Sequence, residues 1–260
     1  MQKKIIVEMH PLVSLRLIKK QILLIFTIIL ILTAQTGIFA QSLDTLSNSF
    51  SYIPSVYGLS GSFGFGYEFG EGSNLAKDSL LETGAETAKI TGNELWQIDI
   101  FAQWLISTKF GAALDVSVGS LAFAVLGYNT AGDPVEGLSY SYLNMDIAAL
   151  FSYNRNFWKG IFSVMAGPLL GFPLGDGQVI LKSEDVTSKY TVPEDQMLNA
   201  SLGGMIDTGY ALALGPGFID FGLKITYHYS SVQGFLTTDA IPLNIITPSI
   251  SVGYYLRGKK

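Results

Sequence analysis

The chain has 260 residues, of which 48% are hydrophobic and only 14% charged, with 28 glycines, no cysteine and a formal net charge of −5. Without cysteine, we expect no disulfide, no thiolate chemistry and no lipid anchor attached through a thiol. The mean hydropathy of +0.36 is high, yet past residue 40 no apolar run approaches the ~20 residues of a membrane helix. This combination favours membrane-crossing strands.

The first 40 residues predict a secretory signal peptide. The basic leader holds Lys3, Lys4, Arg16, Lys19 and Lys20. The apolar run 22–32 follows it, and the less apolar stretch 33–40 ends in the small residue Ala40. We expect cleavage after Ala40, with translation starting at Met1 or Met9. The alternative is an uncleaved anchor helix, for which this apolar run is short.

Removal of residues 1–40 makes the remaining chain more acidic. That stretch holds five of the 16 basic residues and one of the 21 acidic residues, which leaves 11 basic and 20 acidic residues and a net charge of −9. Nucleic acid is therefore excluded as a partner, because phosphate binding needs a basic surface.

After a polar lead-in, residues 41–54, apolar and polar side chains alternate with the period of two that is typical of strands. In residues 218–231, apolar side chains from Ile219 to Tyr229 occupy odd positions, and polar or small ones from Asp220 to Ser230 occupy even positions. We predict eight such segments, at about 55–69, 95–107, 109–126, 140–153, 157–172, 197–214, 218–231 and 246–257.

The connections between these segments alternate between short and long. Short turns fall near 107–109, 154–156 and 215–217, and long loops cover 70–94, 127–139, 173–196 and 232–245. Outer-membrane barrels have short turns on the inside and longer loops outside. The sequence therefore predicts an all-β fold over residues 55–257, an eight-stranded antiparallel up-and-down transmembrane β-barrel of the bacterial outer membrane.

An eight-stranded barrel is narrow, and its own side chains about fill the interior. We expect a polar network in the lumen, centred on Lys224 and Arg257, because buried charges must be paired or neutralised. Its predicted members are Glu68, Asp99, Asp115, Asp146, Asp207, Asp220, Lys224, His228 and Arg257. We predict no metal site and no cofactor.

Four stretches resemble the outer-membrane β-barrel domain of PorT-like proteins. They are FSVMAGPLLGFPLG (162–175), LNASLGGMIDTGYALAL (198–214), FIDFGLKITYHYSSVQGF (218–235) and PSISVGYYLRG (248–258). The resemblance implies membrane location and an eight-stranded barrel, and it allows an accessory role in a secretion machine. The last strand departs from the usual pattern, because it ends in Arg257 and two lysines instead of an aromatic residue.

His228 and Ser230 also resemble the His-x-Ser element of outer-membrane lipid A deacylases. In that family the histidine is the base, the serine is the nucleophile and a downstream glutamate orients the histidine. Here Asp239 is the only later acid, and His228 and Ser230 share the predicted inward face of Lys224. We therefore predict a lumen histidine and no enzyme, and keep a membrane-embedded lipid A acyl hydrolase as the alternative.

The function expected from these patterns is a structural or binding role through the extracellular loops, with a lumen plugged by polar side chains. The expected partners are outer-membrane lipid or lipopolysaccharide, and a protein or ligand at the extracellular loops. Besides the hydrolase, the alternatives are a channel and the accessory barrel of a secretion machine.

Overall fold

The computed structural model describes residues 55–183, 186–193, 200–233 and 240–258. The predicted signal peptide, residues 1–40, the lead-in, residues 41–54, and Asp239 lie outside the described residues.

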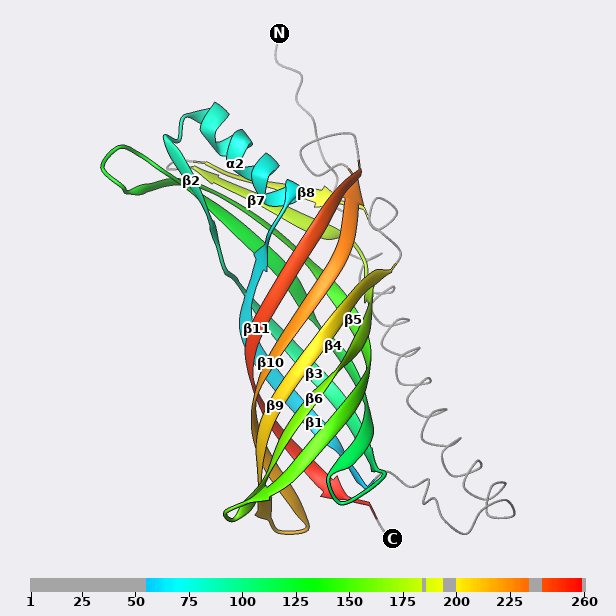
Figure 1. The fold of residues 1–260 in the computed structure, drawn as a ribbon. Helices are drawn as coiled ribbons and strands as arrows, with labels where there is room; N and C mark the ends of the chain where they lie inside the picture. The colour runs from blue at the N-terminus through cyan, green and yellow to red at the C-terminus, as the bar shows by residue number, and fades with distance from the viewer. Residues whose placement is uncertain (1–54, 184–185, 194–199, 234–239, 259–260) are drawn as a thin grey trace. The chain divides into compact units, whose positions relative to one another are not determined.

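Eight long antiparallel strands form a closed ring (Figure 1). They are β1 (Val56–Glu68), β3 (Asn93–Leu105), β4 (Phe110–Tyr128), β5 (Pro134–Phe157), β6 (Gly160–Pro173), β9 (Ser201–Leu214), β10 (Gly217–Gln233) and β11 (Ala240–Arg257). Each strand pairs with the next one in this order, and β1 pairs with β11 from Val56–Arg257 to Glu68–Ile245. The predicted eight-stranded up-and-down barrel is confirmed.

The alternation in sequence becomes an alternation between lumen and exterior. Along β10, Asp220, Lys224 and His228 are buried in the ring, while the intervening Leu223 and Ile225 are about half exposed on the outside. Residues two apart in a strand share a face, so one register decides every position.

The outer wall is apolar around the ring and has aromatic side chains toward both ends of the strands. Exposed members include Tyr57, Leu59, Phe63, Phe65, Trp96, Ile98, Phe110, Phe151, Ile206, Leu223, Tyr227, Tyr229, Ile250, Val252 and Tyr254. Among the described residues, no helix is long and apolar enough to cross a membrane. A closed strand ring pairs its backbone groups internally, which hydrocarbon requires. A closed ring with an apolar outer wall is the fold of an outer-membrane-type β-barrel.

The longest connections contain further elements. Residues 70–94 form helix α2 (Glu71–Thr83) and strand β2 (Thr87–Thr91), and residues 173–196 contain strands β7 (Gly177–Ser183) and β8 (Thr187–Val192). The sequence pattern does not indicate this helix, because its buried side is made mostly of small residues, such as Gly72, Ser73 and Ala76, and shows no apolar stripe. Glycines with positive φ flank the helix, at Gly70 (155°) and Gly84 (123°), a conformation that other residues rarely adopt.

Strands β4 and β5 extend beyond the ring and carry the added strands. Strand β2 pairs with residues Ala124 to Tyr128 of β4, and strand β7 pairs with residues Glu136 to Ser141 of β5. Strand β8 pairs with β7. The sequence pattern predicts a loop at 127–139, but the connection between these strands spans only residues 129–133. In Figure 1, α2 lies along this extension at the long-loop end.

One hydrophobic core joins α2, the extension and the ends of β10 and β11. We call it the mouth core; it contains Ala76, Leu80, Ala85, Leu121, Phe123, Val125, Leu138, Tyr140, Tyr142, Val179, Val192, Val232, Ile241, Leu243 and Ile245. Because residues far apart in sequence share this core, the long-loop end is a packed structure attached to the ring.

Replacement of Leu80 by alanine should loosen α2. Leu80 is fully buried in the mouth core, and such truncations cost about 2–5 kcal/mol. We expect protease cleavage within residues 71–83 to accelerate strongly while the ring stays folded. Leu81→Ala is the matched control, since Leu81 is 43% exposed. Equal cleavage rates in both variants would contradict the packing.

Candidate functional site

Lys224 holds the centre of a buried polar group in the lumen. Its Nζ lies 2.7 Å from Asp99 Oδ1 and 3.4 Å from Asp115 Oδ2. Ser60 Oγ donates to the second oxygen of Asp99 at 3.0 Å. These side chains come from β10, β3, β4 and β1, so the Lys224 ammonium links strands on opposite sides of the ring through its ion pairs.

Acidic groups outnumber basic ones in the lumen. Lys224 is the only buried lysine or arginine among the described residues, whereas Asp99, Asp115, Asp146, Asp207 and Asp220 are all buried on the strands. Glycines on neighbouring strands give these carboxyl groups space. A Cβ at Gly209 would lie 2.7 Å from Asp220 Oδ1, and one at Gly222 would lie 3.2 Å from Asp207 Oδ1.

His228 lies in a second polar group nearer the long-loop end. Its Nδ1 is 3.4 Å from Ser201 Oγ, and its Nε2 is 3.6 Å from Asp146 Oδ2. Asp146 also accepts hydrogen bonds from Gln97 Nε2, at 2.9 Å, and from the amide of Asn144. All these side chains are buried.

The three residues Ser201, His228 and Asp146 are of the types that form nucleophile–base–acid triads. The sequence does not predict Ser201 as a member of this group, because the three residues lie on separate strands, β9, β10 and β5, and no local spacing relates them. Burial limits what they can do, since their exposed fractions are only 2%, 0% and 1%. Side chains this deeply buried in the described structure have almost no exposed atoms to offer a substrate bond, so we assign the group to lumen packing.

The His228–Ser230 pair of the hydrolase alternative is also inside the ring. Ser230 is 6% exposed and His228 is fully buried. A lipid hydrolase would need both side chains to face the acyl chains, and the observed register turns them away from lipid. Asp239, the third candidate for this chemistry, lies outside the described residues.

Two predicted members of the lumen network occupy other places. Glu68 lies near the long-loop end, where its carboxylate accepts hydrogen bonds from the backbone N–H of Ser73 in α2 and of Asn244 in β11. Arg257 is exposed at the end of β11, with its guanidinium 4.6 Å from the centre of the Phe218 ring. The predicted pairing centre therefore contains Lys224 without Arg257, because a strand end faces solvent.

Apolar side chains occupy the lumen beside these polar groups. A second cluster, which we call the lumen cluster, contains Phe101, Ala113, Ala148, Leu150, Met165, Leu169 and Met205. At the short-turn end, Gln103 Nε2 donates to Ser152 Oγ at 2.7 Å and to Asn154 Oδ1 at 3.2 Å. Within the described parts of the chain, no group of three or more His, Asp or Glu side chains could hold a metal ion.

Known protein-family models and curated proteins contain no match to this sequence. Solved structures do resemble it. Outer membrane protein OprG from Pseudomonas aeruginosa is 13% identical, with a TM-score of 0.41 over 79% of this chain and 97% of OprG. Ail, the attachment invasion locus protein of Yersinia pestis, is 10% identical, with a TM-score of 0.33 over 78% and 99% of the two chains. Outer membrane protease OmpT from Escherichia coli is 7% identical, with a TM-score of 0.37 over 83% and 100%.

Replacement of Lys224 by methionine should destabilise the barrel strongly. The change removes the ammonium and leaves Asp99 and Asp115 buried without it, a loss that costs about 3–5 kcal/mol in buried pairs. Urea unfolding in lipid vesicles measures the effect, and adding Asp99→Asn should recover part of the loss. Lys109→Met, at an exposed turn, is the control. A Lys224→Met barrel as stable as this control would refute the central role of the ion pair.

Proposed function

We propose that this outer-membrane barrel has a structural or binding role exerted at its long-loop end, and that its lumen is closed to transport. The observation that carries the proposal is the mouth core, which packs α2 and the extended strands over the end of the ring. A loop region ordered before binding loses less conformational entropy when a ligand or partner arrives. This part of the protein is therefore suited to present a fixed surface.

The composition of the lumen supports closure. Lys224, His228 and the buried aspartates share the interior of the ring with the apolar side chains of the lumen cluster, and the mouth core lies at the long-loop end. Eight-stranded rings leave room for little more than their own side chains. Since His228 and Ser230 face this interior, no observation favours the lipid A hydrolase.

Planar-bilayer recordings test the closed lumen. We expect no single-channel currents from the purified full-length protein, even at high protein load, because apolar side chains interrupt any water path. A water-filled porin reconstituted at the same protein-to-lipid ratio is the positive control. Reproducible unitary currents that depend on the protein would overturn the proposal and revive the channel alternative.

We further propose that residues 1–40 are removed on export and that 41–54 precede the barrel as a polar lead-in. The basic leader, the apolar run 22–32 and the small residue Ala40 support this division. N-terminal sequencing of the membrane-bound protein should find Gln41 first. A membrane-bound form that retains residues 1–40 would instead support the anchor helix.

We also propose that the chain is PorT-like. The stretches that carry this resemblance lie mostly on β6, β9, β10 and β11, four consecutive strands of the ring. A sequence profile built from this chain and its homologues should draw in PorT-like proteins, and a profile that draws in none would remove the assignment. An accessory role in a secretion machine depends on this family and has no independent support in the described residues.

A further inference from the structure

The outer surface has a pocket beside the point where the pairing between β3 and β4 ends. Pairing between these strands stops at Gln97–Gly119, and β2 joins the same edge of β4 only from Ala124 onward. Residues 120–123 lie in the resulting gap, where Ser120 Oγ accepts a hydrogen bond from the Trp96 N–H at 3.2 Å. A pocket of about 460 Å³ opens there, between the outer wall and the extension.

The lining of this pocket is rich in hydrogen-bonding groups. Ser120, Ser139 and Ser141 supply hydroxyls, Asn93 and Glu94 supply an amide and a carboxylate, and Lys182 supplies an ammonium. These groups come from β3, β4, β5 and β7, so the extension of the sheet is what brings them together. Such a set suits a ligand with several hydroxyls and an anionic group.

Lysines add positive charge on the same face of the extension. By register, Lys182 lies opposite Gly137, Lys189 opposite Ile180 and Lys89 opposite Leu126. Directly paired residues share a face of a sheet, so all three lie on the outer face with Ser139. The three lysines are exposed, in a chain whose overall charge is negative.

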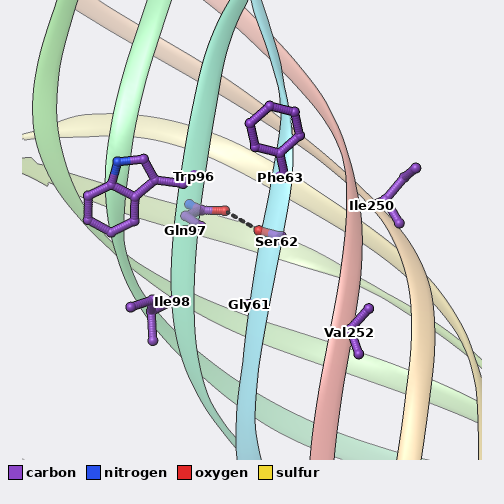
Figure 2. A pocket seen from close by; sticks show the side chains of 8 residues that line it. All are labelled: Gly61, Ser62, Phe63, Trp96, Gln97, Ile98, Ile250 and Val252. Carbon is purple, nitrogen blue, oxygen red and sulfur yellow. Dashed lines mark hydrogen bonds between the residues drawn. The ribbon is translucent and has the colours of Figure 1, made fainter.

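An apolar groove of about 540 Å³ lies on the barrel wall next to this pocket (Figure 2). Phe63, Trp96, Ile98, Ile250 and Val252 stand around Gly61, which has no side chain. A Cβ built at Gly61 would meet only the Gln97 carbonyl oxygen, at 3.8 Å. The floor of the groove is therefore open because this position is glycine.

The pocket and the groove are adjacent, because Phe63 and Trp96 line both. Aromatic side chains in barrels mark the level where the hydrocarbon meets the headgroups. The polar pocket thus lies on the long-loop side of this level and the apolar groove on the hydrocarbon side. This order matches the order of headgroup and acyl chain in a single lipid molecule.

We propose that this combined surface binds one molecule of lipid A, the phosphorylated and acylated glycolipid of the outer leaflet. Its sugar hydroxyls and a phosphate occupy the pocket, where the serines, Glu94 and Lys182 contact them. One acyl chain lies in the groove over Gly61. We infer a glycolipid because the pocket offers many hydrogen-bonding groups. We infer the outer leaflet because the long loops of such barrels face outward.

The test is native mass spectrometry of the full-length protein in detergent, titrated with lipid A and, separately, with phosphatidylglycerol. We expect one lipid A molecule to bind more tightly than phosphatidylglycerol. Gly61→Leu, which fills the groove, should weaken lipid A binding at least tenfold. Lys182→Gln should weaken it about fivefold, the usual effect of one lysine near an anionic lipid surface.

Two matched controls keep the result interpretable. Gly204→Leu places the same side chain at another glycine with open space, where a Cβ would meet only the Gly167 carbonyl oxygen at 3.7 Å. Lys109→Gln removes an exposed lysine at the short-turn end. Both should bind lipid A as the wild type does, and gel mobility without boiling checks that each variant is folded. Equal binding by all folded variants, or equal affinity for phosphatidylglycerol, would overturn the proposal.

Discussion

The closure of β1 onto β11 is the constraint on which the rest of the structure depends. In hydrocarbon, each backbone N–H and C=O must find a partner within the protein. An open sheet would leave two unpaired edges, and the pairing from Val56–Arg257 to Glu68–Ile245 removes both. Once the ring is closed, each strand has one face to lipid and one to the lumen. The apolar outer wall and the buried charges are consequences of that single event.

The lumen shows how a narrow ring accommodates charge. One lysine, Lys224, lies among carboxyl groups from several strands, and glycines such as Gly209 and Gly222 leave room for them. Ion pairs of this kind are expensive to form and costly to break, so they favour one register over its alternatives. The Ser201–His228–Asp146 group shows the same logic, because residue types known from catalysis serve packing when they are buried in the lumen.

The long-loop end and the outer wall offer a different kind of chemistry. There the extension of β4 and β5 places hydroxyls and lysines beside a lipid-facing groove, and α2 is held by the mouth core on the other side of the sheet. Strands β4 and β5 continue past the rim of the ring, and this extension produces both the folded long-loop end and the proposed lipid site. Neither would arise from loops without secondary structure.

The sequence by itself determined the barrel, the number of its strands and the inward face within each long strand, because a period of two survives any rearrangement of loops. The inward faces of Asp99, Lys224 and His228 could be predicted for that reason. Only the tertiary structure decided which side chains contact each other. Lys224 contacts Asp99, Ser201 lies beside His228, and Arg257 lies apart from the lumen charges. These arrangements depend on the stagger of the strands around a closed ring, which local patterns do not encode. Helix α2 and the pocket beside Trp96 also needed the structure, because small buried residues and a gap between strands leave no periodic signal.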